Sequence, residues 1–174
     1  MNEFPKRKHP RLRGYDYSRN GAYFLTFCVK DKNELLGRIA VGRGILDAPF
    51  MQLSEHGRTL TEAIEFLNKK ANAVAIEKYV IMPNHVHLIA TIDNWSNGAS
   101  RMSRPTDARV PRLISSIKRF TNKKAGFNLW QRTYHDHIIR SEGDYLRIWQ
   151  YIDQNPARWF EDCYYVKSAQ DTLL

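Results

Sequence analysis

The sequence predicts an α+β protein in which an antiparallel sheet carries helices packed on one face. Runs of β-branched and aromatic residues with the length of strands alternate with segments whose apolar residues recur at helical spacing. Their order is strands, a helix, two strands, a helix, a strand and a final helix, which is typical of helices packed against a sheet. Hydrophobic residues make up 43% of the 174 residues, enough for the core of one such domain.

The two ends of the chain differ from its centre in composition. Residues 1–19 are rich in proline, arginine and lysine and are predicted to form an irregular basic arm. The folded domain is expected over 20–160, and 161–174 are expected to form a C-terminal tail. The sequence shows no internal repeat and no second domain.

The first half of the domain begins with a strand over 21–29, where aromatic and β-branched residues are dense. Shorter strands interrupted by glycines are expected over 34–50. Ser54 is of the type that caps a helix N-terminus, and it precedes apolar residues that recur every three to four positions. Those residues are Leu60, Ile64 and Leu67.

Two further strands are predicted over 73–83 and 85–92, joined by a turn at Pro83 and Asn84. Residues 94–108 are polar and are predicted to form a loop. A helix is expected from about residue 108 to residue 124. Its core-facing stripe consists of Val110, Leu113, Ile114, Ile117 and Phe120.

The last elements are a strand over 134–140 and a helix that ends before Pro156. Ser141 and Asp144 have the spacing of a capping box, so the helix is predicted to begin there. Its apolar stripe consists of Tyr145, Ile148, Trp149 and Ile152.

The two cysteines, Cys28 and Cys163, match no paired metal-ligand spacing and are interpreted as free thiols in a reducing compartment. The N-terminal residues lack the apolar segment of a signal peptide. No apolar run approaches the roughly 20 residues that span a bilayer. We therefore expect a cytoplasmic protein without a membrane partner.

The net charge of +9 is unevenly distributed. Residues 1–19 carry a net charge of +4 and residues 101–140 carry +8, while the rest of the chain is acidic. Concentrated positive charge attracts polyanions through counterion release, and nucleic acid is the commonest soluble polyanion. A solubilising surface would have the same composition, so charge alone leaves both interpretations open.

Two histidines stand in an otherwise apolar strand, at His85 and His87. Side chains two residues apart on a strand point to the same face, roughly 7 Å apart. Two converging imidazoles suit a divalent metal that retains open positions for substrate. A pair of hydrogen-bonded histidines on a half-exposed strand is the structural alternative.

Tyr151 and Asn155 lie four residues apart on the last helix, to the side of its apolar stripe. A tyrosine beside a metal can attack a phosphodiester, and an amide oxygen one turn later can complete the metal shell. A surface tyrosine followed by a C-capping asparagine would give the same pattern.

Taken together, these motifs resemble the single-tyrosine HUH transposases of bacterial insertion sequences, most closely their REP-associated relatives. The resemblance extends over "RLRGYDYSRNGAYFLTFCV", "YVIMPNHVHLI", "ISSIKRF" and "WQRTYHDHIIRSEGDYLRIWQYIDQNPARW". It implies a ferredoxin-like antiparallel sheet with the histidine strand at its centre.

The resemblance also implies roles for individual residues. His85 and His87 match the histidines that hold Mg²⁺ or Mn²⁺, and Tyr151 matches the nucleophile that forms a 5′-phosphotyrosine with single-stranded DNA. Asn155 takes the place of a third polar ligand, where many relatives have glutamine. Because the histidines must be neutral to bind metal, activity is expected to fall below about pH 6.

A second pair, His135 and His137, has the same spacing and could be the metal site instead. The family comparison places this segment beside the active site. We therefore expect these two residues to support the site, for example by orienting the tyrosine helix.

The expected partner is single-stranded or hairpin DNA lying across the basic regions. Phosphate contacts and stacking on unpaired bases are the expected interactions. The candidate residues are Arg11, Arg13, Arg112, Lys118, Arg119, Lys123, Lys124, Trp130 and Arg132, with Tyr15, Tyr17 and Tyr134 as further candidates for stacking.

Three functions remain open at this point. The first is a metal-dependent DNA strand transferase, which the presence of His85, His87 and Tyr151 favours. The second is a DNA-hairpin-binding protein that keeps the fold without cutting. The third, a metal-dependent RNA nuclease, gives Tyr151 no role. Both a monomer and a homodimer are compatible with the sequence.

Overall fold

The computed structural model describes residues 19–41, 48–70, 74–93 and 109–166. A four-stranded antiparallel sheet forms its centre, in the order β4-β5-β1-β6. The strands are β1 (Gly21–Cys28), β4 (Val74–Ile81), β5 (His85–Ile92) and β6 (His135–Ile139). The predicted α+β class and the central position of the histidine strand are both confirmed.

The register of β1 against β5 determines which residues share a face of the sheet. Thr26 lies opposite His87, and Cys28 lies opposite His85. Because side chains alternate along a strand, Thr26, His85 and His87 share one face with Phe24 and Ile89. Leu25, Phe27, Val86 and Leu88 point to the opposite face, where the larger hydrophobic core lies.

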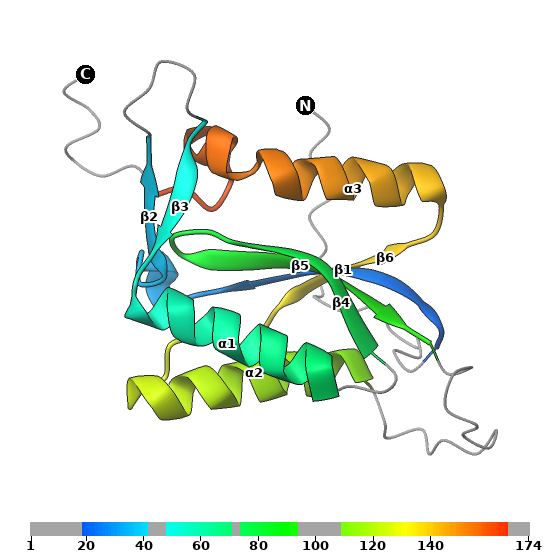
Figure 1. Cartoon of the computed structure of the whole chain (residues 1–174), viewed down its shortest axis with the longest axis horizontal. Coiled ribbons are helices and arrows are strands. Elements are labelled where there is room, and N and C mark those ends of the chain that lie inside the picture. Colours follow the sequence, from blue (N-terminus) through cyan, green and yellow to red (C-terminus); the bar gives the residue numbers. More distant parts are fainter. Residues whose placement is uncertain (1–18, 42–47, 71–73, 94–108, 167–174) are drawn as a thin grey trace.

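Helices α1 (Glu55–Lys70) and α2 (Arg109–Ala125) cover the face with the larger core (Figure 1). The hydroxyl of Ser54 accepts a hydrogen bond from the Gly57 N–H at 3.1 Å, so Ser54 caps α1 as predicted. A side chain at Gly57 would meet the Leu36 carbonyl oxygen at 2.1 Å, and this close approach requires glycine.

Helix α3 (Glu142–Gln154) lies on the other face of the sheet, which differs from the expectation of helices on one face only (Figure 1). Its residues Ile148 and Ile152 pack against Phe24, Ile89 and Ile139. The reason is visible in β5, which is buried at seven of its eight positions and therefore needs cover on both sides. Ser141 accepts a hydrogen bond from the Asp144 N–H at 3.2 Å, as the capping prediction required.

Smaller elements complete the described chain. A two-stranded hairpin consists of β2 (Gly37–Ala40) and β3 (Phe50–Leu53), and two 3₁₀ segments are η1 (Lys30–Lys32) and η2 (Pro156–Glu161). The predicted loop 94–108 and most of the predicted arm lie outside the described residues. Cys28 and Cys163 are free thiols. No helix in the described ranges has both the length and the apolar composition needed to cross a bilayer.

Candidate metal and nucleophile site

The two histidines of β5 meet at their Nε2 atoms, on the face of the sheet that α3 covers. His85 is 0% exposed and His87 is 2% exposed, and the two Nε2 atoms lie 3.0 Å apart. The expected convergence of the pair is therefore present. Because both rings are buried, the hydrogen atoms on their nitrogens are set by neighbouring protein groups.

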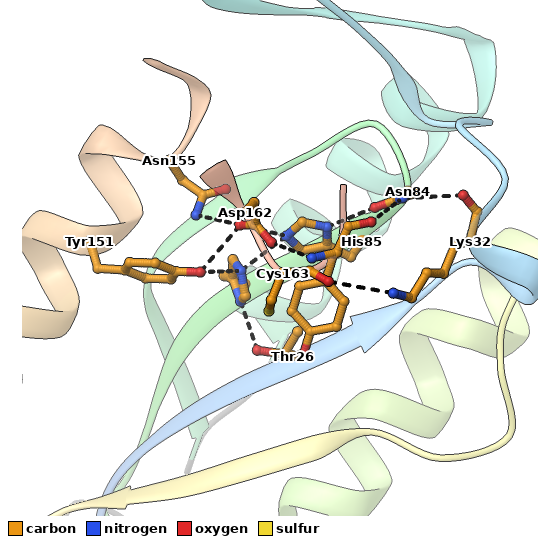
Figure 2. Close-up of polar contacts among 10 residues, drawn as sticks. Thr26, Lys32, Asn84, His85, Tyr151, Asn155, Asp162 and Cys163 are labelled. Carbon is orange, nitrogen blue, oxygen red and sulfur yellow. Dashed lines mark hydrogen bonds and ion pairs between the residues drawn. The ribbon is translucent and has the colours of Figure 1, made fainter. Parts of the chain in front are cut away.

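Asn84 determines which nitrogen of His85 carries a hydrogen. Its amide nitrogen donates to the carbonyl oxygens of Lys32 at 3.1 Å and Tyr164 at 2.9 Å, so its Oδ1 faces His85 (Figure 2). That oxygen can only accept, and it lies 2.8 Å from His85 Nδ1. His85 Nδ1 therefore carries the hydrogen, and a lone pair on Nε2 points toward His87.

His87 is held by residues of β1. Its Nδ1 lies 2.7 Å from the hydroxyl of Thr26, and its ring stacks on Phe24 at a centroid distance of 5.2 Å. A metal-binding histidine commonly has its other ring nitrogen bonded to a protein group, which fixes the ring orientation. Both histidines of this pair satisfy that requirement.

Burial keeps both imidazoles neutral. It lowers the pKa of His85 well below its ordinary value, with further lowering by the nearby His87 and Lys32. Burial also lowers the pKa of His87 to about 3. We expected protons to compete for the ligand nitrogens below about pH 6, and these shifts move that competition to lower pH.

Acid is expected to destabilise the protein through His87. An unfolded chain binds a proton there near pH 6.5, whereas the folded chain does so only near pH 3. The stability contributed by the neutral ring is therefore complete above pH 6.5 and is lost as the pH falls toward 3. At pH 5 the free energy of unfolding should be lower by about 2 kcal/mol because of this residue.

Urea unfolding at pH 7 and pH 5 measures this effect, with His87→Gln as the matched variant. From pH 7 to pH 5, the free energy of unfolding of the wild type should fall by about 2 kcal/mol more than that of His87→Gln. An equal fall in the free energy of unfolding of both proteins would contradict the lowered pKa of His87, because the two proteins share all other titrating groups.

Tyr151 brings its hydroxyl to the histidine pair from α3. The hydroxyl oxygen lies 3.2 Å from His87 Nε2, and the hydroxyl donates to Asp162 Oδ2 at 3.3 Å (Figure 2). The ring contacts Phe24 edge-on at 6.0 Å. Burial, followed by the negative charge of Asp162, raises the pKa of this phenol. Tyr151 is therefore protonated at neutral pH and needs help to become a nucleophile.

Asn155 approaches the same site with its amide nitrogen. It is 3% exposed, and its Nδ2 donates to Asp162 Oδ2 at 3.2 Å. Its Oδ1 is buried, and no hydrogen-bond partner is found for it within the described residues. The amide that we expected to bind metal thus contacts a carboxylate.

Asp162 was not identified from the sequence. It follows η2 and lies in the stretch that we assigned to the C-terminal tail. Its Oδ2 lies 3.9 Å from His85 Nε2, and its Oδ1 accepts a hydrogen bond from the Tyr164 N–H at 2.7 Å. No periodicity or spacing marks this residue, because a turn brings it back over β5.

The residues at this site fit a divalent metal. One ligand atom from each of His85, His87 and Asp162 lies within 4.8 Å of the others. Imidazole nitrogens together with a carboxylate oxygen are donors that first-row divalent ions accept. The two Nε2 atoms face one another at 3.0 Å, where either the hydrogen of a neutral His87 or a bound cation can lie between them.

The second histidine pair contacts a different partner. His137 Nε2 lies 2.7 Å from Asp144 Oδ2, in the first turn of α3, and Arg147 binds the other oxygen of that carboxylate. His135 is exposed on the edge strand β6. His137 thus connects the sheet to the N-terminus of the tyrosine helix.

Most of the candidate DNA-binding residues within the described ranges are exposed. Helix α2 lies across the sheet from α3 (Figure 1) and contains Arg112, Arg119, Lys123 and Lys124. Arg132 is exposed on the segment before β6. Arg11, Arg13, Tyr15 and Tyr17 lie outside the described residues.

Three other candidates have structural roles. Trp130 is 2% exposed, and its indole N–H donates to the hydroxyl of Thr121 at 2.7 Å, so its expected stacking on bases is corrected to a core role. Tyr134 is likewise 6% exposed. Lys118 donates to the carbonyl oxygens of Gln131 at 2.7 Å and Thr133 at 3.0 Å, and burial lowers its pKa to about 8.

The chain is similar in sequence to two proteins of Haemophilus influenzae. No family model matches it. An uncharacterized protein of Haemophilus influenzae is 34% identical over 180 residues, which cover 92% of this chain and 93% of that protein. A second Haemophilus influenzae protein, described as a "Putative REP-associated tyrosine transposase", is 24% identical over 149 residues, 82% of this chain and 74% of its own.

One solved structure has a similar fold. A REP-associated tyrosine transposase bound to a REP hairpin superimposes with a TM-score of 0.56 at 21% identity, over 91% of this chain and 74% of that one. This match concerns the arrangement of the sheet and helices. The 34% match spans nearly the whole length of both proteins and makes them members of one family.

Proposed function

We propose that this chain is a REP-associated tyrosine transposase, a metal-dependent endonuclease and strand transferase that acts on single-stranded DNA beside a hairpin. A relative with that description is 24% identical to it, and a solved structure of such a transposase has a similar fold. The observation that carries the proposal is the position of Tyr151, whose hydroxyl lies 3.2 Å from the metal-facing nitrogen of His87. A surface tyrosine that merely ends a helix has no reason to contact a buried histidine pair.

In the proposed reaction the Tyr151 oxygen attacks the scissile phosphorus. A bond forms between that oxygen and phosphorus, and the bond between phosphorus and the 3′ oxygen breaks. The phenol gives up its proton and the departing 3′ oxygen takes one, so a 5′-phosphotyrosine and a free 3′-OH result. One phosphoester replaces another, and the 3′-OH of a second strand can therefore reverse the step without an energy source.

The metal is proposed to be Mg²⁺ or Mn²⁺, held by His85 and His87. When bound, a divalent cation would polarise the phosphate and favour the phenolate form of the tyrosine. Thr26 and Asn84 keep the two rings in place, while Phe24 contacts both His87 and Tyr151. His137 is proposed to orient the tyrosine helix through Asp144.

The DNA is proposed to contact the exposed cations of α2 as well as the catalytic face. This helix contains no acidic residue, and five of its 17 residues are lysine or arginine besides Lys118. The hairpin stem offers regularly spaced phosphates to such a stripe. Contacts on both faces of the sheet would allow a stem and a single strand to be held at once.

Removing two α2 cations is expected to weaken the salt dependence of DNA binding. Each phosphate contact contributes roughly 0.7 to 0.9 to the slope of log K against log salt concentration. The double variant Arg119→Gln, Lys123→Gln should therefore lower that slope by about 1.5. Fluorescence anisotropy with a labelled hairpin across a range of salt concentrations measures it.

The matched control removes two charges from the neighbouring helix, in Lys69→Gln, Lys70→Gln. Both double variants have the same net charge, so an equal effect from each would indicate general attraction. Such a result would argue against a specific phosphate contact on α2.

The proposed function is tested with hairpin oligonucleotides taken from the sequence that flanks the gene. Each is labelled at the 5′ or the 3′ end, incubated with Mn²⁺ or EDTA, and separated on a denaturing gel. The proposal predicts a metal-dependent adduct that carries the 3′ label, together with a free 5′-labelled fragment. Salt-sensitive binding without an adduct would indicate a hairpin-binding protein, and cleavage without protein attachment would indicate a nuclease that uses water.

A further inference from the structure

The Asp162 carboxylate is a buried negative charge without a matching positive side chain. Its side chain is 2% exposed. Within the described residues, no lysine or arginine lies within ion-pair distance of it, and the nearest basic atom is His85 Nε2 at 3.9 Å. Asn155, Tyr151 and the Tyr164 backbone donate hydrogen bonds to it, and all three are neutral groups.

A carboxylate in this position normally has a counter-charge. Removing an ionised carboxylate from water costs several kcal/mol even after the protein relaxes, and buried charges are accordingly paired or bound to metals. His85 does not form a close ion pair with it, because its Nε2 lies 3.9 Å from Asp162 Oδ2 and faces His87 Nε2 at 3.0 Å. A bound cation would therefore supply the counter-charge that no side chain gives to the Asp162 carboxylate.

The carboxylate is fixed in an orientation that suits a metal ligand. Oδ1 is held by the Tyr164 N–H at 2.7 Å, which leaves Oδ2 turned toward the histidine pair. Asn155 Nδ2 and the Tyr151 hydroxyl donate to Oδ2 at 3.2 and 3.3 Å. These donors leave one side of the oxygen facing His85 (Figure 2).

We propose that Asp162 is the third protein ligand of the metal and that Asn155 is a positioning residue that holds this carboxylate. The inference deepens the proposed function and rests on it, because that function supplies the reason for a metal between His85 and His87. Two imidazoles and a carboxylate reduce the net charge of the site with a bound divalent ion to +1. An amide ligand in place of the carboxylate would leave it at +2.

Metal binding without DNA tests the assignment. Free Mn²⁺ is measured by its electron paramagnetic resonance signal during titration of the wild type, Asp162→Asn, Asn155→Ala and, as a matched control on the neighbouring exposed carboxylate, Glu161→Gln. Asp162→Asn should weaken binding by about 100-fold or more, and Asn155→Ala by about tenfold, as for residues that orient a ligand. Glu161→Gln should bind as the wild type does.

Thermal unfolding gives a second measurement that guards against simple misfolding. Without metal, Asp162→Asn should be at least as stable as the wild type, because an uncompensated buried charge has been removed. The rise in Tm that Mn²⁺ produces in the wild type should be lost in this variant. A rise in Tm with Mn²⁺ that is as large in Asp162→Asn as in the wild type would overturn the assignment.

The outcomes separate this inference from the proposed function. Wild-type affinity in Asp162→Asn, or a larger loss in Asn155→Ala than in Asp162→Asn, would overturn the ligand assignment whatever the DNA assay shows. Weakened binding in Asp162→Asn supports it even if no DNA adduct forms, in which case only the transesterification fails. Wild-type Mn²⁺ affinity in His85→Ala would overturn the metal site itself.

Discussion

Tyr151→Phe should abolish the covalent protein–DNA adduct, with a loss on the order of 1,000-fold or more in the rate of its formation. Only the hydroxyl is removed, and the ring contacts with Phe24 and His87 remain available to phenylalanine. The phenol oxygen is the only atom of the tyrosine side chain that can attack phosphorus. A denaturing gel with Mn²⁺ and labelled hairpin DNA measures the loss, while hairpin affinity should stay within about twofold.

Two further tyrosines make this experiment specific. Tyr145 lies on the same helix and packs against the α3 side of the sheet, so Tyr145→Phe is the matched control and should retain the adduct. Tyr164 also contacts the histidines, with its ring centroid 4.5 Å from that of His85 and 5.9 Å from that of His87. An adduct that survives in Tyr151→Phe but is lost in Tyr164→Phe would transfer the nucleophile to Tyr164.

Replacing either histidine of β5 is expected to have the second largest effect. His85→Ala or His87→Ala removes one of two converging nitrogens, and adduct formation in Mn²⁺ should fall by about 100-fold or more. Raising the Mn²⁺ concentration should recover part of the activity, because the loss lies in metal affinity. The rate of adduct formation as a function of Mn²⁺ concentration distinguishes this result from a loss of folding.

The second histidine pair provides the control. His135 has the same spacing from its neighbour but is exposed on the edge strand, so His135→Ala should form the adduct at the wild-type rate. A normal adduct in His87→Ala together with its loss in His135→Ala would assign the metal to the second pair.

Helix and strand limits were predictable because their signals are local. Ser54 and Ser141 each cap a helix where the sequence placed them, and each cap depends on residues within one turn. The prediction that all helices pack on one face of the sheet was wrong for α3, which packs on the opposite face from α1 and α2. Its apolar stripe shows that one side is buried, but not against which face of the sheet it lies.

The site was predictable only where its residues follow a spacing rule. His85 and His87 share a face because they lie two apart on a strand, and Tyr151 and Asn155 because they lie four apart on a helix. Asp162 follows no such rule, since a turn after α3 places it. The prediction that Trp130 stacks on bases was wrong, because it was based on the basic residues near Trp130 in the sequence. No spacing rule indicates that its indole N–H donates to the buried hydroxyl of Thr121.

The contacts that form the site also have a consequence for the order of folding. His87 meets Tyr151 across 64 residues, and Asn84 meets Tyr164 across 80. Contacts between distant parts of a chain form late, because closing a long loop loses entropy before any contact compensates for it. The contact between Thr26 and His87 spans 61 residues, nearly as many as the contact between His87 and Tyr151, so the histidine pair and the tyrosine are expected to reach their positions together at a late stage of folding.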